Sequence, residues 1–139
     1  MAFRQDPPPA NAGPDRDEAD EPALDARVID SLQRLQRPGA PSLVGRLVAL
    51  YRAEAPALLD AIDAAIAGGR AQDLRHAAHP LKSSSAMLGA AGLAAIAARL
   101  EACGHEGALE GTAALALQAR QELDRVLRAL DARIGPGGA

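Results

Sequence analysis

The residues best suited to chemistry lie in the stretch Leu74 to Ala90, LRHAAHPLKSSSAMLGA. It places His76 and His79 three residues apart and follows them with Lys82 and three consecutive serines, Ser83 to Ser85. A neutral imidazole has a nucleophilic lone pair and can attack a phosphoryl group. A nearby lysine can offset the charge on the phosphoryl oxygens. The stretch therefore suggests a nucleophilic histidine with a supporting cation.

The stretch also has the period of an amphipathic helix. At about 100° per residue, one narrow sector holds the expected core stripe of Leu74, Ala78, Leu81, Ser85 and Leu88. His79 falls about 140° from Leu74 on this wheel, so we expect its side chain to face solvent. Its neighbours on the helix are Arg75, Lys82 and Ser83, with Ala86 further along. Two cations flank the histidine, and the small side chains leave room for a partner protein.

Pro80 directly follows His79. Proline disfavours the helical conformation in the residue before it and removes a backbone donor. If the helix continues, the carbonyl of His76 loses its hydrogen bond. We therefore expect a local kink at the histidine.

The composition indicates which elements position these residues. The chain has 139 residues, 48% of them hydrophobic but only 1% aromatic, so one core must be built from Leu, Ile, Val and Ala. Such side chains pack well between closely spaced helices, and β-branched residues are sparse. The first prediction is an all-α fold.

Hydrophobic periodicity predicts five helices. They lie within residues 23–39 and 41–69, from near Ala71 to near Gly89, from about Ala91 to Cys103, and from about Thr112, a candidate cap, to Ile134. The expected inward stripes outside the third helix are Leu24, Val28, Leu32 and Leu35; Leu43, Leu47, Leu50, Tyr51, Leu58, Ile62 and Ile66; Leu93, Ile96, Ala97 and Leu100; and Leu123, Val126, Leu127, Leu130 and Ile134.

Local signals refine these helices. Asp25 is expected in the first turn of the first helix and Ser42 at the N-cap of the second, while Pro56 should kink or divide the second helix. The last four helices are long enough for an antiparallel, up-down four-helix bundle, with the N-terminal helix capping one end. We expect this domain at residues 23–134, a disordered Pro- and acid-rich leader or linker at 1–22, and a flexible tail at 135–139.

The net charge and the cysteine content limit the classes of function and the cellular location that we expect. The net charge of −3 gives no basic footprint for nucleic acid. One cysteine, Cys103, excludes a disulfide framework and favours a reducing cytosol. No apolar run approaches the roughly 20 residues of a membrane-spanning helix, and the N-terminus lacks the apolar centre of a signal peptide. We expect a soluble cytoplasmic protein without membrane insertion, and a monomer because the bundle closes on itself.

The segment AAHPLKSSSAMLGAAGLAAIAARLE, which ends at Glu101, resembles the signature of histidine-containing phosphotransfer (HPt) domains. In that family an Ala-His pair is followed by x-Leu-Lys, small residues, a Leu-Gly pair and, one helix later, Leu-Glu. The motif spans Ala78 to Glu101, and the helix pattern extends the resemblance from about Leu24 to Ile134.

The resemblance implies a role for each matching residue. His79 would be the phosphoacceptor, Lys82 the cation that supports the phosphoryl charge, and Glu101 the residue that orients the imidazole through its other ring nitrogen, where many members have Gln. Ser83 replaces the commoner glycine and could contact the phosphoryl group. Pro80 is a less usual residue after the histidine.

The resemblance also implies a docking surface and partners. Arg75, Ala86, Met87 and Gly89 would take part in docking, and Gly89 would also permit close helix packing or end its helix. An HPt domain has no kinase activity and binds no ATP. It takes a phosphoryl group from an aspartate of one receiver domain and passes it to an aspartate of another. The Mg²⁺ ion belongs to the receiver, so the chain would need no cofactor of its own.

The partners expected from the resemblance are receiver domains of a hybrid sensor kinase or a response regulator. The leader fits the linker at the end of such a kinase, which could be membrane-bound, as well as it fits a free-standing bacterial protein. The direction of phosphoryl flow stays open.

Other interpretations of the same residues stay open. Asp73, His76 and His79 could bind a metal, but each step of three turns about 60° around the helix, so the ligands diverge. A bundle that only binds a partner is a second alternative. Glu101 could pair with Arg99, Arg70 or Arg75. His76 and His105 are expected to be surface residues and Cys103 a core thiol, and no carboxylate pair suggests a hydrolase.

Overall fold

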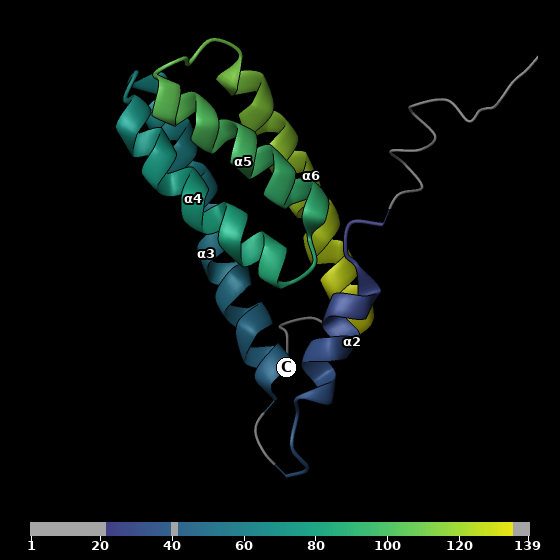
Figure 1. Ribbon diagram of the computed structural model, residues 1–139. Coiled ribbons are helices and arrows are strands. Elements are labelled where there is room, and N and C mark those ends of the chain that lie inside the picture. Colours follow the sequence, from purple (N-terminus) through teal and green to yellow (C-terminus); the bar gives the residue numbers. More distant parts are fainter. Residues whose placement is uncertain (1–21, 40–41, 135–139) are drawn as a thin grey trace, which may run out of the picture.

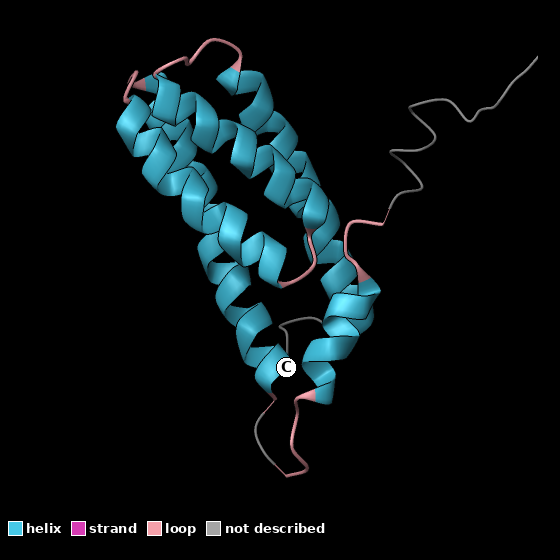
Figure 2. Ribbon diagram, in the orientation of Figure 1, coloured by secondary structure: helices cyan, strands magenta, loops and turns pink. Residues whose placement is uncertain are grey.

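The computed structural model describes residues 22–39 and 42–134. Apart from Pro22, the predicted leader at 1–22 and tail at 135–139 lie outside the described residues. The helices are α2 (Ala26–Arg34), α3 (Leu43–Ala67), α4 (Ala71–Met87), α5 (Ala91–Glu106) and α6 (Thr112–Ile134). Figure 2 shows helices and loops and no strand in this part of the chain. The predicted all-α fold is confirmed.

The four long helices form an antiparallel bundle (Figure 1). α4 packs between α3 and α5, and α6 packs against both α5 and α3. Short turns join α3 to α4 and α4 to α5, so consecutive helices run in opposite directions. The arrangement places α4 and α5 side by side over most of their length.

The short helix α2 covers one end of the bundle, as predicted (Figure 1). The Asp25 backbone N–H donates to the Gly89 carbonyl at 2.9 Å, which ties the start of α2 to the α4–α5 turn. Arg133 of α6 lies 3.5 Å from Asp30 of α2. These contacts anchor α2 to two different parts of the bundle.

Two helix starts have side-chain caps. The Ser42 hydroxyl accepts a hydrogen bond from the Gly45 N–H at 2.9 Å, so the predicted N-cap is confirmed. Asp25 is the N-cap of α2, where its carboxylate accepts from the Arg27 N–H at 3.0 Å, and it does not lie in the first turn. Pro56 does not divide its helix, because α3 continues through it to Ala67.

The core confirms the stripe predicted for α4: Leu74, Ala78, Leu81, Ser85 and Leu88 are all buried. Two assignments in other helices were wrong. Leu50 is 54% exposed, and Leu35 is exposed beyond the end of α2, where Ile29 is buried instead. The first half of α3 is apolar on nearly every face, so its periodicity does not select the inward one. The buried residues there include Val44, Val48, Tyr51, Ala55 and Leu59.

One buried polar pair joins α3 to α4. The hydroxyl groups of Tyr51 and Ser85 lie 2.9 Å apart inside the core. Burial raises the pKa of the Tyr51 phenol to about 12. One hydroxyl donates to the other, so each buried oxygen has a hydrogen-bond partner and the pair links the two helices inside the core.

Ion pairs join α6 to α3. Arg120 of α6 contacts Asp60 and Asp63 of α3, each at 2.7 Å. Arg52 of α3 pairs with Asp131 near the end of α6. In the described ranges, no helix combines the length and apolar character needed to cross a lipid bilayer.

Candidate functional site

His79 lies in the middle of α4, on the face opposite the core stripe, and its side chain is 61% exposed. The next residue, Pro80, lies inside the same unbroken helix. Since proline has no N–H, the carbonyl of His76 lacks its usual helical donor. The local kink at His79 stays a prediction. The exposure confirms that the imidazole faces solvent, where another protein can reach it.

The His79 ring is held by a carboxylate from the neighbouring helix. Its Nδ1 atom lies 2.7 Å from Oε2 of Glu101 in α5. An ionised carboxylate only accepts hydrogen bonds, so the neutral ring must carry its proton on Nδ1 and donate it to Glu101. That tautomer leaves the lone pair on Nε2. The contact therefore fixes both the orientation of the ring and the nitrogen that can act as a nucleophile.

Lys82 binds the other oxygen of the same carboxylate. Its Nζ lies 2.6 Å from Oε1 of Glu101, whose side chain is only 20% exposed. The hydrogen bond from Lys82 lowers the pKa of the Glu101 carboxyl, against the opposing effect of burial, and the bond from His79 lowers it further. Glu101 is thus held in the ionised form that the contact with His79 requires.

The close approach of α4 and α5 depends on a glycine that the sequence analysis did not single out. A Cβ at Gly104 would lie 2.7 Å from the Ala71 carbonyl oxygen and 2.7 Å from the Arg75 nitrogen. The two backbones therefore touch one turn after Glu101, which brings its carboxylate within reach of His79. The predicted helix from about Ala91 to Cys103 stops one residue before Gly104, whereas α5 continues to Glu106, so the sequence did not mark this glycine as a helix contact.

The turn between the two helices is also set by a glycine. Gly89 has a φ of +82° and follows α4, in agreement with the prediction that it ends this helix. It is buried, and a Cβ there would lie 2.9 Å from the Val28 Cβ and 3.1 Å from the Asp25 carbonyl oxygen. The assignment of Gly89 to the docking surface is therefore corrected, because α2 covers it.

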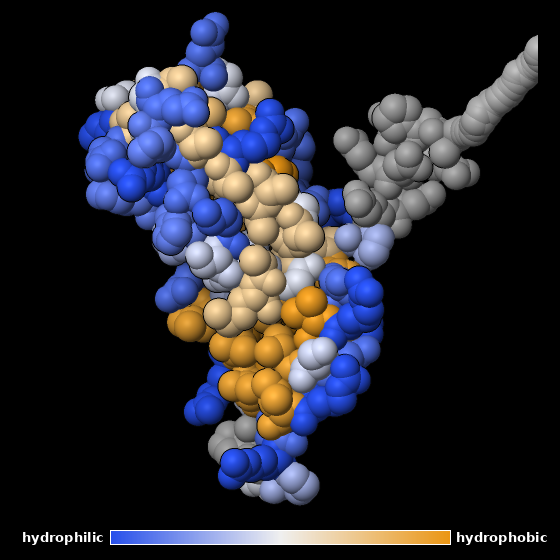
Figure 3. All heavy atoms as spheres, viewed as in Figure 1, coloured by the Kyte–Doolittle hydropathy of each residue, from blue (hydrophilic) through white to orange (hydrophobic). Residues whose placement is uncertain are grey.

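The other predicted residues lie around His79 on α4. Ser83, one turn later, and Ala86 are exposed, Arg75, one turn earlier, is half-buried, and Met87 is 55% exposed. Figure 3 shows strongly apolar surface concentrated where α4 ends and the first half of α3 runs. Exposed Leu50 belongs to that part of α3. An exposed apolar area therefore lies further along α4 from His79.

The alternative pairings of these residues are not found. Glu101 contacts His79 and Lys82, and Arg70 binds Asp73 at 2.9 Å. Within residues 22–39 and 42–134, no three His, Cys, Asp or Glu side chains gather closely enough to hold a metal ion. The proposed metal ligands on α4 are therefore not brought together. His76 and His105 are exposed, as expected, and Cys103 is half-buried.

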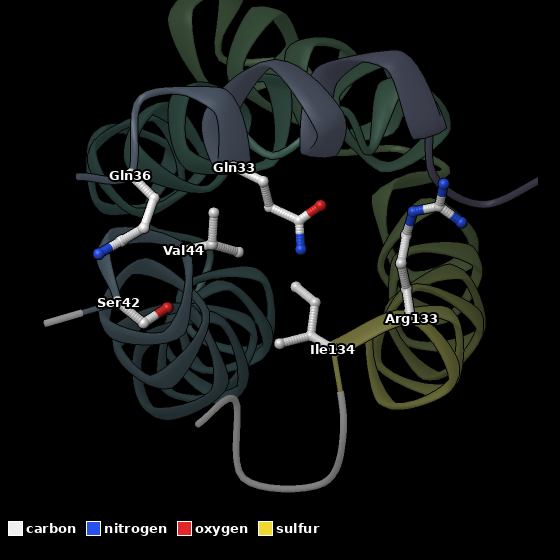
Figure 4. A pocket seen from close by; sticks show the side chains of 6 residues that line it. All are labelled: Gln33, Gln36, Ser42, Val44, Arg133 and Ile134. Carbon is white, nitrogen blue, oxygen red and sulfur yellow. The ribbon is translucent and has the colours of Figure 1, made fainter. Parts of the chain in front are cut away.

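A cavity of about 320 Å³ lies at the α2 end of the bundle (Figure 4). Its lining residues are Gln33, Gln36, Ser42, Val44, Arg133 and Ile134, none of them from α4 or α5. Two of its polar groups already hold the start of α3: Gln36 Oε1 accepts from the Leu43 N–H at 2.7 Å, and Ser42 caps the helix. The cavity is separate from the His79 site, and its Gln36 and Ser42 side chains have structural roles.

Comparison with known proteins gives two matches. The family model for the Hpt domain matches residues 46–129, which include all of α4 and α5. A solved structure, histidine-containing phosphotransfer protein B (HptB) from Pseudomonas aeruginosa PAO1, is 33% identical, with a TM-score of 0.68 over 77% of this chain and 91% of that one. The search of curated proteins gives no match.

Proposed function

This chain belongs to the Hpt domain family, and on that premise we propose that His79 is the residue that accepts and passes on the phosphoryl group. Hpt domains act as phosphocarriers in two-component phosphorelays and interact with receiver domains, so the role of this chain is phosphotransfer. The main support for His79 is the 2.7 Å contact between its Nδ1 atom and Glu101, which leaves the lone pair on Nε2 free to act as the nucleophile.

The acceptor step forms one bond and breaks one. The Nε2 lone pair of His79 attacks the phosphorus of an aspartyl phosphate on a receiver domain. The N–P bond forms as the P–O bond to the aspartate breaks, and the aspartate leaves as a carboxylate. The Nδ1 proton stays in its hydrogen bond to Glu101, so no proton has to leave the site.

Glu101 favours this step because the phosphorylated ring carries a positive charge while Nδ1 keeps its proton. The adjacent carboxylate stabilises that charge. The same argument holds in reverse, when an aspartate of a second receiver takes the phosphoryl group from His79. Lys82 is the cation of the site, and in the unphosphorylated chain its charge is held by Glu101.

The proposed partner surface surrounds His79 on α4. Arg75 and Ser83 lie one helical turn on either side of it, and Ala86 and Met87 continue toward the apolar end of the helix. The partners we propose are cytoplasmic receiver domains of a hybrid sensor kinase, a response regulator or both. The Mg²⁺ ion would be bound by the receiver, and the chain would supply no cofactor.

Phosphoramidate, a small phosphoryl donor to histidine, tests the proposal without a known partner. Incubation should add one acid-labile phosphoryl group to the intact mass of the wild-type chain. His79→Gln should abolish the gain and keep the helicity, since an exposed side chain contributes little to folding. His76→Gln, which removes an exposed histidine from the same helix, should be labelled normally.

Two results would contradict the proposal. Labelling that survives in His79→Gln but disappears in His76→Gln would show that His76, and not His79, accepts the phosphoryl group. A complete lack of labelling, under conditions that label a known Hpt domain, would favour a bundle that binds partners without carrying a phosphoryl group.

A further inference from the structure

Position 82 holds a residue type that the rest of the chain avoids. Of the fifteen Lys and Arg residues, Lys82 is the one lysine. Arginine makes the ion pairs elsewhere in the described fold, for example between Arg120 and Asp60 and between Arg133 and Asp30. A chain that uses arginine so consistently would be expected to have it here too, unless the site requires the chemistry of an ammonium group.

The geometry of Glu101 shows what that requirement is. The two carboxylate oxygens are divided between two partners: Oε1 lies 2.6 Å from Lys82 Nζ, and Oε2 lies 2.7 Å from His79 Nδ1. An ammonium group is a compact point charge that can bind a single oxygen. A guanidinium is a planar fork that tends to bind both oxygens of a carboxylate in parallel. An arginine at position 82 would therefore compete with His79 for Oε2.

We propose that Lys82 is a positioning residue for the acceptor step, which holds the Glu101 carboxylate by one oxygen and keeps the other aligned with His79, and that arginine cannot replace it. The inference rests on the proposed function of His79. It differs from direct support of the phosphoryl charge, because a positioning role acts only through Glu101. Its effect must therefore disappear when Glu101 no longer provides a carboxylate.

Partial burial of the network supports this role. The Glu101 side chain is 20% exposed and that of Lys82 is 36% exposed, so solvent competes only in part for their contact. Lys82 is one helical turn from His79 on α4, while Glu101 approaches both residues from α5. The three side chains thus form one bridge across the α4–α5 contact, with the carboxylate at its centre.

The first experiment compares rates of phosphoramidate labelling in a double-mutant cycle. Lys82→Gln and Glu101→Gln should each slow labelling of His79 by about tenfold, the effect expected for loss of a hydrogen bond to a charged group. The double variant should be no slower than Glu101→Gln alone. Lys82→Arg should be slow although it keeps the charge. Arg99→Gln, which removes an exposed cation from α5, is the matched control and should label at the wild-type rate.

The second experiment reads the ring directly. In ¹⁵N NMR spectra at a pH where the imidazole is neutral, wild-type His79 should have its proton on Nδ1. Lys82→Gln and Lys82→Arg should both show a mixture of the two tautomers, because the carboxylate is no longer held in place. A purely structural contribution of Lys82 to the fold would leave this ratio unchanged. The measurement needs no phosphorylation, so it tests the positioning role even if His79 is not labelled.

The outcomes distinguish the positioning role of Lys82 from direct support of the phosphoryl charge, and both from the proposed function of His79. If Lys82→Gln slows labelling by the same factor in the Glu101→Gln background as in the wild type, the positioning role is overturned. Lys82 would then act directly on the phosphoryl group. Wild-type labelling in Lys82→Arg, or an unchanged tautomer ratio in the Lys82 variants, would also overturn it. Absence of labelling in the wild-type chain, with the expected shift in tautomers, would contradict the function of His79 and leave the positioning contact standing.

Discussion

Gly104 of α5 lies so close to the backbone of Arg75 in α4 that a Cβ atom at position 104 would be 2.7 Å from the Arg75 nitrogen. This contact is between main chains, so no side-chain rotation can relieve it. It is also one helical turn from Glu101. The spacing of α4 and α5 at this point therefore decides whether the Glu101 carboxylate reaches His79.

We expect Gly104→Ala to reduce both stability and phosphorylation. The added methyl group must push the helices apart, at a cost of about 1–3 kcal/mol in the free energy of unfolding. Labelling by phosphoramidate should slow as Glu101 moves away from His79. Urea unfolding and intact mass would measure the two effects.

Gly92→Ala is the matched control for Gly104→Ala. It adds the same methyl group to α5, where the nearest atom is the flexible Glu122 carboxylate at 2.9 Å. The side chain can move, so stability and labelling should change little. Equal behaviour of the two variants would show that the backbone contact at Gly104 is not what sets the helix spacing.

The core and the exposure of His79 could be predicted from the sequence to different degrees. The stripe of α4 was found because polar residues separate its apolar positions, and the same wheel placed His79 in solvent. The stripe of α3 was partly misplaced at Leu50, because the first half of that helix is apolar on nearly every face.

Contacts between helices were harder to predict than the helices themselves. Glu101 was assigned to His79 only through the family resemblance, and Arg99, Arg70 and Arg75 were equally reasonable partners from the sequence. The choice depends on how closely α5 approaches α4, which the helical period does not encode. Gly104, which permits that approach, lies just beyond the predicted end of its helix at Cys103, so its contact with α4 was not predicted.

The Tyr51 phenol should make stability fall in strongly alkaline solution. Burial raises its pKa to about 12, compared with about 10 for a free phenol. A pKa raised in the folded state gives a stabilising contribution that is complete below pH 10 and is lost as the pH rises toward 12. The loss should be about 1.4 kcal/mol at pH 11.

Tyr51→Phe isolates this effect from the titration of other groups. The difference in unfolding free energy between the wild type and this variant should shrink between pH 9 and pH 11. Because the chain has one tyrosine and no tryptophan, phenolate absorbance would report the Tyr51 titration directly. A titration midpoint near 10 in the folded protein would contradict the predicted loss.

Gly89→Ala should loosen α2 from the bundle. The residue has a positive φ of +82°, and a Cβ would lie 2.9 Å from the Val28 Cβ of α2. Backbone strain of about 1–2 kcal/mol is expected at such a position, and the clash with α2 adds to it. Chemical denaturation should show a clear loss of stability.

Gly69→Ala separates strain from the clash in the Gly89 variant. It has a similar φ of +66°, but a Cβ there meets no atom within 4 Å. It should therefore lose stability through strain alone, and less than Gly89→Ala. If the two variants are equally destabilised, the contact between the α4–α5 turn and α2 contributes nothing measurable.

Met87→Glu should weaken docking to a receiver domain while leaving the chemistry of His79 intact. Met87 is 55% exposed and lies two helical turns from His79, at the apolar end of α4. A carboxylate there would have to be desolvated in an apolar interface. Transfer from a phosphorylated receiver should slow, whereas labelling by phosphoramidate, which needs no docking, should keep its wild-type rate.

Leu117→Glu provides the control for Met87→Glu, because it makes the same kind of change at a residue of similar exposure, 58%, on α6. Since α4 packs between α3 and α5, a receiver placed over His79 would approach from the side of the bundle that α6 does not form. Leu117→Glu should therefore transfer at the wild-type rate. Slower transfer in both variants would mean that the added negative charge acts at long range. Slower transfer in Leu117→Glu alone would place the receiver on the α6 side and contradict docking along α4.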